Sequence, residues 1–220
     1  MCQSSGRETV REISASVLAA DLADLDSEIG EVAAADRLHL DLMDGRFVPN
    51  ITLGFPTIEA IAARADLPLD VHAVIEQPER YADRLASMDV ASVTVHYEAT
   101  DDLPAVVRTL EAGGVTPGVA ISPGTEATVL ETVPDSVTRT TVMSVEPGFG
   151  GQEFMPEVLD KVECLDDETS LTVEIDGGID LDTARRSARA GVDIFVSGST
   201  IFGSPDRAAI VAAQIGRAHV

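Results

Sequence analysis

Residues 39–45 read His-Leu-Asp-Leu-Met-Asp-Gly and form the stretch that decides the fold. Successive side chains of a β-strand point to opposite faces, so His39 and Asp41 share one face while the leucines beside them take the other. A nearly continuous apolar run of this kind is typical of a parallel strand that is buried on both sides. The stretch therefore predicts a central strand that carries two polar side chains on one face.

Similar apolar runs recur along the chain, and an amphipathic stretch of helical pattern follows each of them. The predicted strands are residues 13–17, 38–42, 69–74, 92–96, 117–121, 140–145, 171–175 and 193–196. The predicted helices are residues 24–35, 57–65, 78–88, 103–112, 126–132, 156–165, 181–190 and 205–215. Strands that alternate with helices indicate a parallel sheet, and this number of units predicts a single-domain α/β fold, the (β/α)8 or TIM barrel. The alternative is an open doubly wound sheet, but no Gly-x-Gly-x-x-Gly motif follows the first strand.

Two further strand ends carry ionisable side chains of the same kinds. His72 lies near the end of the run at 69–74, and Asp176 directly follows the run at 171–175. Catalytic groups of such barrels sit at the carboxyl ends of the strands, so we predict that both converge with His39 and Asp41, Asp176 arriving from across the ring.

For any one of these residues taken alone, a role in packing or as a helix cap is a simpler interpretation than a functional role. Four ionisable groups in one barrel mouth, however, cost several kcal/mol unless they are paired or bound to a metal ion. A mixed histidine and carboxylate set suits zinc, manganese or iron(II). Asp41 and Asp176 are in addition candidates for acid/base chemistry.

Glycine-rich loops follow the last three predicted strands, at residues 147–152 (Pro-Gly-Phe-Gly-Gly-Gln), 177–178 and 198–199. Any one of them could be a simple tight turn. Glycine also lets backbone N–H groups approach an anion closely, and the loops after strands seven and eight are the habitual phosphate site of this architecture. Lys161 is the single lysine, so we expect a phosphate to be held by backbone donors.

The length of 220 residues fits one domain, and a hydrophobic content of 45% is sufficient for a buried core. We assign residues 12–220 to the barrel and residues 1–11 to a polar leader without the apolar centre of a signal peptide. No apolar run approaches the roughly 20 residues that a membrane span needs. Cys2 and Cys164 form no Cys-x-x-Cys pair and fit a reducing compartment, so we expect a cytoplasmic protein.

The net charge is −23, from 38 acidic residues against 15 Lys and Arg. Such a field repels nucleic acid and anionic membranes, and we expect neither as a partner. The charge either keeps a heavily solvated surface soluble or adapts the protein to high salt, which screens self-repulsion. The second interpretation predicts lower stability in dilute buffer.

On the basis of these residues, the chain resembles the ribulose-phosphate 3-epimerase family. The resemblance extends over nearly its whole length, from residues 13–18 to residues 197–202. The most specific pieces are residues 39–45 together with residues 47–50 (Phe-Val-Pro-Asn), residues 143–152 (Met-Ser-Val-Glu-Pro-Gly-Phe-Gly-Gly-Gln) and residues 174–178 (Glu-Ile-Asp-Gly-Gly). One departure is Ala73-Val74, where the family usually has a larger residue and a methionine near the active site.

The resemblance implies a metal-dependent epimerase of the pentose phosphate pathway, which interconverts D-ribulose 5-phosphate and D-xylulose 5-phosphate by proton transfer at C3 through an enediolate. One divalent ion is implied, with zinc favoured and manganese, iron or cobalt as alternatives. Its implied ligands are His39, Asp41, His72 and Asp176, of which Asp41 and Asp176 would also be the acid/base pair. The implied sugar-phosphate contacts are Ser16, His72, Gly148, Phe149, Gly150, Gly151, Gly177, Gly178, Gly198 and Ser199. We expect a homo-oligomer.

Two rival functions remain at this point. A related epimerase acting on D-allulose 6-phosphate would share every ligand, and the small side chain of Val74 keeps it open because it can enlarge a pocket. A non-catalytic phosphate-binding barrel is permitted by the fold alone, although such a module has no need of two opposed carboxylates.

Overall fold

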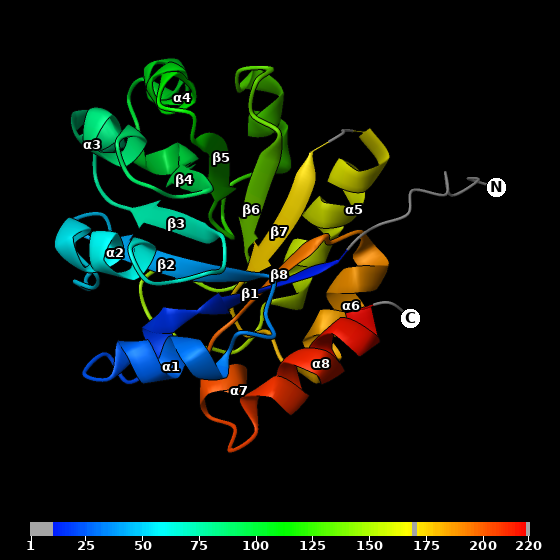
Figure 1. The fold of residues 1–220 in the computed structure, drawn as a ribbon. Helices are drawn as coiled ribbons and strands as arrows, with labels where there is room; N and C mark the ends of the chain where they lie inside the picture. The colour runs from blue at the N-terminus through cyan, green and yellow to red at the C-terminus, as the bar shows by residue number, and fades with distance from the viewer. Residues whose placement is uncertain (1–10, 169–170, 219–220) are drawn as a thin grey trace.

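The computed structural model describes residues 11–168 and 171–218. Within them the strands close into one barrel, and every neighbouring pair is parallel (Figure 1). The predicted (β/α)8 barrel is therefore confirmed. The strands are β1 (Glu12–Ser16), β2 (Arg37–Met43), β3 (Leu69–Val74), β4 (Ser92–His96), β5 (Thr116–Ile121), β6 (Arg139–Met143), β7 (Thr172–Asp176) and β8 (Ile194–Ser197).

The α-helices lie outside the ring of strands, as parallel crossovers require (Figure 1). They are α1 (Leu25–Glu31), α2 (Phe55–Ala62), α3 (Ala82–Ala86), α4 (Leu103–Ala112), α5 (Leu159–Glu168), α6 (Leu181–Ala190), α7 (Ser199–Phe202) and α8 (Arg207–Ala218). Short 3-10 helices complete the connections: η1 (Val17–Ala19), η2 (Pro78–Tyr81), η3 (Tyr97–Ala99), η4 (Ala127–Thr132) and η5 (Pro156–Val158).

Several helix predictions need correction. The segment predicted as a helix at 126–132 is the 3-10 helix η4, because its β-branched residues lower α-helix propensity and short segments often take the tighter form. The predicted helix at 78–88 is divided between η2 and α3, and the one at 156–165 opens with η5. The helix predicted at 24–35 ends at Glu31, directly after Gly30. Helix α7 is not predicted, since four residues are too few to show a helical period.

The two faces of β2 separate as the sequence indicates. Leu38, Leu40 and Leu42 pack in the main hydrophobic core between the barrel and its helices, whereas His39 and Asp41 are buried on the other face, inside the barrel. Buried leucine faces of this kind hold a strand in one register, because a one-residue slip would place leucines inside the barrel and charges in the core.

An ionic layer fills the barrel interior below the polar tips of β3 and β7. The guanidinium of Arg139 donates to both carboxylate oxygens of Asp70 at 3.1 Å each and to Glu174 at 2.6 Å. Gly118 on β5 makes room for this side chain, since a Cβ there would lie 3.0 Å from Cγ of Arg139 and 2.4 Å from Oγ1 of Thr94. Asp70 and Glu174 stand two residues before His72 and Asp176, so this layer supports the mouth from beneath.

Residues 1–10 of the predicted leader lie outside the described residues. Arg11, its last member, donates a hydrogen bond to the carbonyl oxygen of Ala188 at 2.8 Å, which ties the start of the barrel to α6. Among the described residues, no helix combines the length and the apolar character needed to cross a membrane.

Candidate metal centre and active site

Four side chains meet at the carboxyl-terminal mouth of the barrel: His39 and Asp41 from β2, His72 from β3 and Asp176 from β7. One ligand atom from each lies within 4.8 Å of every other. Nε2 of His39 is 3.4 Å from Oδ1 of Asp41 and 3.6 Å from Oδ2 of Asp176. Nδ1 of His72 is 3.4 Å from each of the same two oxygens. The predicted convergence of the four residues is thus present in the structure.

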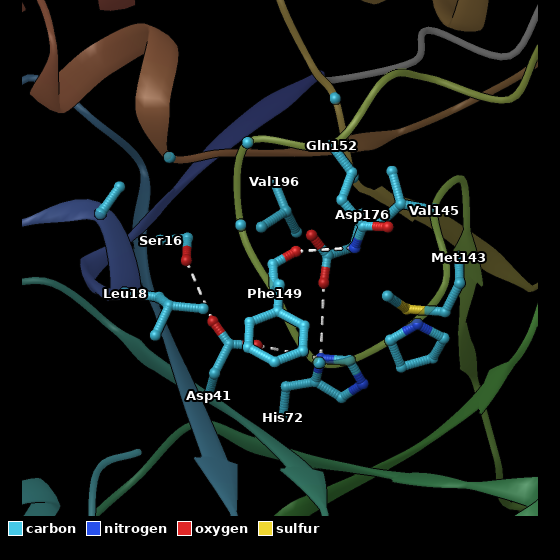
Figure 2. A pocket seen from close by; sticks show the side chains of 18 of the residues that line it. Ser16, Leu18, Asp41, His72, Met143, Val145, Phe149, Gln152, Asp176 and Val196 are labelled. Carbon is cyan, nitrogen blue, oxygen red and sulfur yellow. Dashed lines mark hydrogen bonds and ion pairs between the residues drawn. The ribbon is translucent and has the colours of Figure 1, made fainter. Parts of the chain in front are cut away.

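Strand register produces this meeting. Asp41 pairs directly with His72 across the β2–β3 ladder, so their side chains leave the sheet at the same height. Asp176 is the last residue of β7, where it pairs with Met143 of β6 and Val196 of β8. Its carboxylate reaches the cluster from the other side of the ring, as Figure 2 shows.

The cluster fits a divalent cation by two tests. Nε2 of His39 and Nδ1 of His72, the two nitrogens that face the cluster, are buried without a hydrogen-bond partner among the described residues, which is costly unless something else binds them. Four donor atoms at about 2.1 Å from one ion at tetrahedral angles would stand roughly 3.4 Å apart, which matches the spacing between the histidine nitrogens and the carboxylate oxygens. The site can therefore bind a metal ion through two imidazoles and two carboxylates.

The cluster also sets its own protonation. Burial disfavours the charged imidazolium, but the carboxylates of Asp41, Asp176 and Glu174 together outweigh it and raise the pKa of His39 to about 10. The pKa of His72 is raised by Asp176 and Asp41 against the same burial. Burial acts against the Asp41 carboxylate, yet His39 and His72 hold its pKa below the ordinary value. Without a cation His39 thus carries a proton that a metal ion must displace.

A pocket of about 430 Å³ opens above the cluster (Figure 2). Of the predicted site residues its lining contains Ser16, Asp41, His72, Gly148, Phe149, Gly150, Gly151, Asp176, Gly177, Gly178, Gly198 and Ser199. His39 is the exception, because it lies behind the lining with a 1% exposed side chain and reaches the site only through the ligand cluster. Phe149 is 54% exposed at this mouth.

Glycine is required where β7 turns into the pocket. Gly177 has a φ of +121°, and a Cβ there would lie 2.5 Å from Cγ2 of Val145. Gly178 has a φ of +62°, and a Cβ there would lie 2.7 Å from the backbone nitrogen of Phe154. Close packing and left-handed backbone together exclude larger residues, so this turn keeps its backbone next to the pocket.

Sequence reasoning missed two groups around the site. The amide of Asn50 donates to the carbonyl oxygen of Gly148 at 2.7 Å and joins the loop after β2 to the loop after β6. His96 lies 3.0 Å from His72 and 3.2 Å from Glu98, and none of the predictions included this pair. The sequence does contain a signal for His96, because this residue ends the predicted strand at 92–96, as other candidate site residues end theirs.

The geometry defines the class of protein. It is a (β/α)8 barrel with a buried centre of two histidines and two aspartates, and its pocket lies at the mouth, where such barrels have their catalytic residues. A model described as Ribulose-phosphate 3 epimerase family matches residues 12–202. The chain belongs to this family, and the predicted family and enzyme class are confirmed.

Individual relatives agree with this assignment. A protein of Mycobacterium tuberculosis named ribulose-phosphate 3-epimerase is 46% identical over 206 residues, covering 91% of this chain and 90% of the relative. One of the same name from Bacillus subtilis is 41% identical, covering 89% and 94%. Among solved structures, 3-hexulose-6-phosphate synthase from Salmonella typhimurium superimposes with a TM-score of 0.72 at 16% identity, covering 94% of this chain and 98% of that one, which supports the fold alone.

Proposed function

We propose that this chain interconverts D-ribulose 5-phosphate and D-xylulose 5-phosphate by moving the proton at C3. The observation that carries the proposal is the pair Asp41 and Asp176, which reach one buried centre from β2 and β7 in a chain of this family. Inversion through a planar enediolate needs one base on each face of the substrate, and these strands lie apart in the ring.

The carboxylate oxygens divide into two sets. Oδ1 of Asp41 and Oδ2 of Asp176 face the histidines, so His39, Asp41, His72 and Asp176 would hold the ion through these atoms. That leaves Oδ2 of Asp41 and Oδ1 of Asp176 for the substrate. In one direction Asp41 takes the C3 proton on Oδ2 and Asp176 delivers a proton from Oδ1 to the opposite face; in the reverse direction the roles exchange.

A cation held by these four residues would supply Lewis-acid stabilisation of the negative charge that develops on the substrate oxygens during proton removal. We propose zinc as the preferred ion, because two imidazoles and two carboxylates at tetrahedral spacing suit it best, with manganese, iron or cobalt as alternatives.

The phosphate end of the substrate would lie against the glycine turns. Gly177, Gly178, Gly198 and Ser199 line the pocket on one side, and residues 148–151 line it on another. No lysine or arginine belongs to this lining, among the residues that the structure describes. Lys161 instead donates to the carbonyl oxygens of Pro123 and Thr125 at 2.6 Å each. We infer that backbone N–H groups and the Ser199 hydroxyl bind the phosphate. A homo-oligomer and a cytoplasmic location remain predictions.

The decisive experiment is a coupled assay of the purified protein on D-ribulose 5-phosphate, with and without a chelator. We expect turnover that the chelator removes and added metal restores, and product formed in D2O should carry deuterium at C3. Turnover without solvent label would contradict proton exchange through the two carboxylates.

D-allulose 6-phosphate, tested in parallel, addresses the rival substrate. Val74 lines the pocket with a short side chain, and faster turnover of the six-carbon substrate would favour that function. A metal-loaded protein that turns over neither substrate would point to a non-catalytic barrel.

A further inference from the structure

His72 makes a second contact on the side of its ring that faces away from the cluster. Its Nε2 lies 3.0 Å from Nε2 of His96, and the two rings are nearly parallel, with an interplanar angle of 22° and centroids 5.0 Å apart. His96 is fully buried at the end of β4, next to β3. The ring of Phe47 packs against its ring at 5.0 Å. Both nitrogens of His72 therefore have a defined neighbour.

The protons along this contact can be assigned from the donors and acceptors. Nδ1 of His72 faces the two carboxylates of the cluster and must offer its lone pair to a cation, so the ring hydrogen stands on Nε2. Nε2 of His96 must then accept this hydrogen, which leaves the hydrogen of His96 on Nδ1. That atom lies 3.2 Å from Oε2 of Glu98, a carboxylate that accepts it.

Glu98 is itself anchored on its other oxygen. Oε1 accepts hydrogen bonds from the backbone nitrogen of Ser122 at 2.7 Å and from the hydroxyl of Thr125. Lys161 binds the carbonyl oxygens of the same short loop after β5. A carboxylate can accept on both sides at once, whereas a glutamine in its place must turn its NH2 group toward either His96 or the loop donors.

We infer that His96 and Glu98 are positioning residues of the metal centre, which hold the His72 ring with Nδ1 toward the cation and Nε2 protonated. The inference rests on the metal centre proposed above. It adds His96, which contacts the ligand His72, and Glu98, which contacts His96. A group that accepts the free ring N–H of a metal-bound histidine orients it and increases its strength as a ligand, and removing such a group typically weakens metal affinity by about 10- to 100-fold. Here His96 is that group, and Glu98 acts through it by keeping the hydrogen of His96 on Nδ1.

The test compares Glu98→Gln with Glu79→Gln. Glu79 is the matched control, because its carboxylate also accepts a threonine hydroxyl, that of Thr100 at 3.0 Å, without contact to a ligand of the centre. Zn²⁺ affinity is measured by competition with a chromophoric chelator, beside thermal unfolding of each variant. We expect Glu98→Gln to bind Zn²⁺ about 10- to 100-fold more weakly and Glu79→Gln to match the wild type. If Glu98→Gln lowers the unfolding temperature and leaves Zn²⁺ affinity unchanged, its role is only structural and the inference is wrong.

A second measurement needs no variant. In the Zn²⁺-loaded wild-type protein, ¹⁵N NMR of the histidine rings should show His72 and His96 as neutral, with the hydrogen of His72 on Nε2 and that of His96 on Nδ1. A His72 ring that carries its hydrogen on Nδ1 overturns the inference even if Glu98→Gln does not fold. Failure of the wild type to bind Zn²⁺ overturns the metal centre together with the inference, whereas equal affinity in wild type and Glu98→Gln overturns the inference alone.

Discussion

The hydroxyl of Ser16 donates a hydrogen bond to Oδ2 of Asp41 at 3.0 Å, whereas Oδ1 of the same carboxylate stands 3.4 Å from each of two histidine nitrogens. One carboxylate thus presents two oxygens in different surroundings. Ser16 ends β1 and pairs with His39 of β2, so the neighbouring strand holds its hydroxyl in place. The proposed proton-transfer oxygen is therefore oriented by a partner outside the ligand set.

Replacing Ser16 by alanine is expected to lower kcat/KM by about 10- to 100-fold. A hydrogen bond to a charged group is worth about 1.5–3 kcal/mol, and the alanine variant loses the group that orients Oδ2 of Asp41. Steady-state kinetics at saturating Zn²⁺ measure the effect. Ser16→Thr keeps a hydroxyl and should recover most of the activity; equal losses in both variants would mean that the hydroxyl is not the cause.

The change Asp176→Asn should keep the fold and reduce turnover by at least about a hundredfold, because an amide cannot exchange the C3 proton. Zn²⁺ content and circular dichroism are measured on the same sample, so that loss of metal is separated from loss of the proton donor. Asp135→Asn is the control, since this carboxylate is exposed on the surface. Near-normal turnover of metal-loaded Asp176→Asn would end the two-base mechanism.

The stability of the metal-free protein should fall as pH rises from about 6.5 to about 10. Burial lowers the pKa of His39, but the carboxylates of Asp41, Asp176 and Glu174 together raise it to about 10 in the fold, against an ordinary value of 6.5. The stabilising proton is fully bound in both states below about pH 6.5 and is lost from the folded state near pH 10. Urea unfolding of chelator-treated protein across this range measures the trend.

Saturating Zn²⁺ provides the comparison for this pH series. When Nε2 of His39 binds the metal ion, this nitrogen carries no proton that a rise in pH could remove. We expect the Zn²⁺-loaded protein to lose less stability over the same interval. A metal-free protein of constant stability from pH 6.5 to pH 10 would contradict the protonated state assigned to His39.

The ionic layer beneath the site should contribute far more to the free energy of unfolding than an exposed ion pair of the same length. Glu174 and Glu59 each lie 2.6 Å from an arginine nitrogen, but Glu174 is 0% exposed and Glu59 is 46% exposed. Glu174→Gln breaks a buried pair with Arg139 and should cost about 3–5 kcal/mol of unfolding free energy. Glu59→Gln should cost no more than about 1 kcal/mol. Denaturant titrations of the two variants decide, and equal costs would show that burial does not control this pair.

The barrel was predictable because its signals are local. The alternation seen around His39 and Asp41 places leucines on one face of a strand whatever the rest of the chain does. Helix types and ends were less predictable. The segment at 126–132 has a helical pattern, yet β-branched residues and shortness leave it as η4.

The sequence by itself determined which residues can bind a cation and which strand ends carry them, because residue chemistry and strand periodicity are properties of short segments. Only the tertiary structure decided which atoms do so. The β2–β3 register sets Asp41 beside His72, and the closure of the ring brings Asp176 within 3.6 Å of His39. The contact of His72 with His96, and through it with Glu98, likewise depends on the packing of β3 against β4. Such contacts join residues far apart in the chain, so no local pattern specifies their distances.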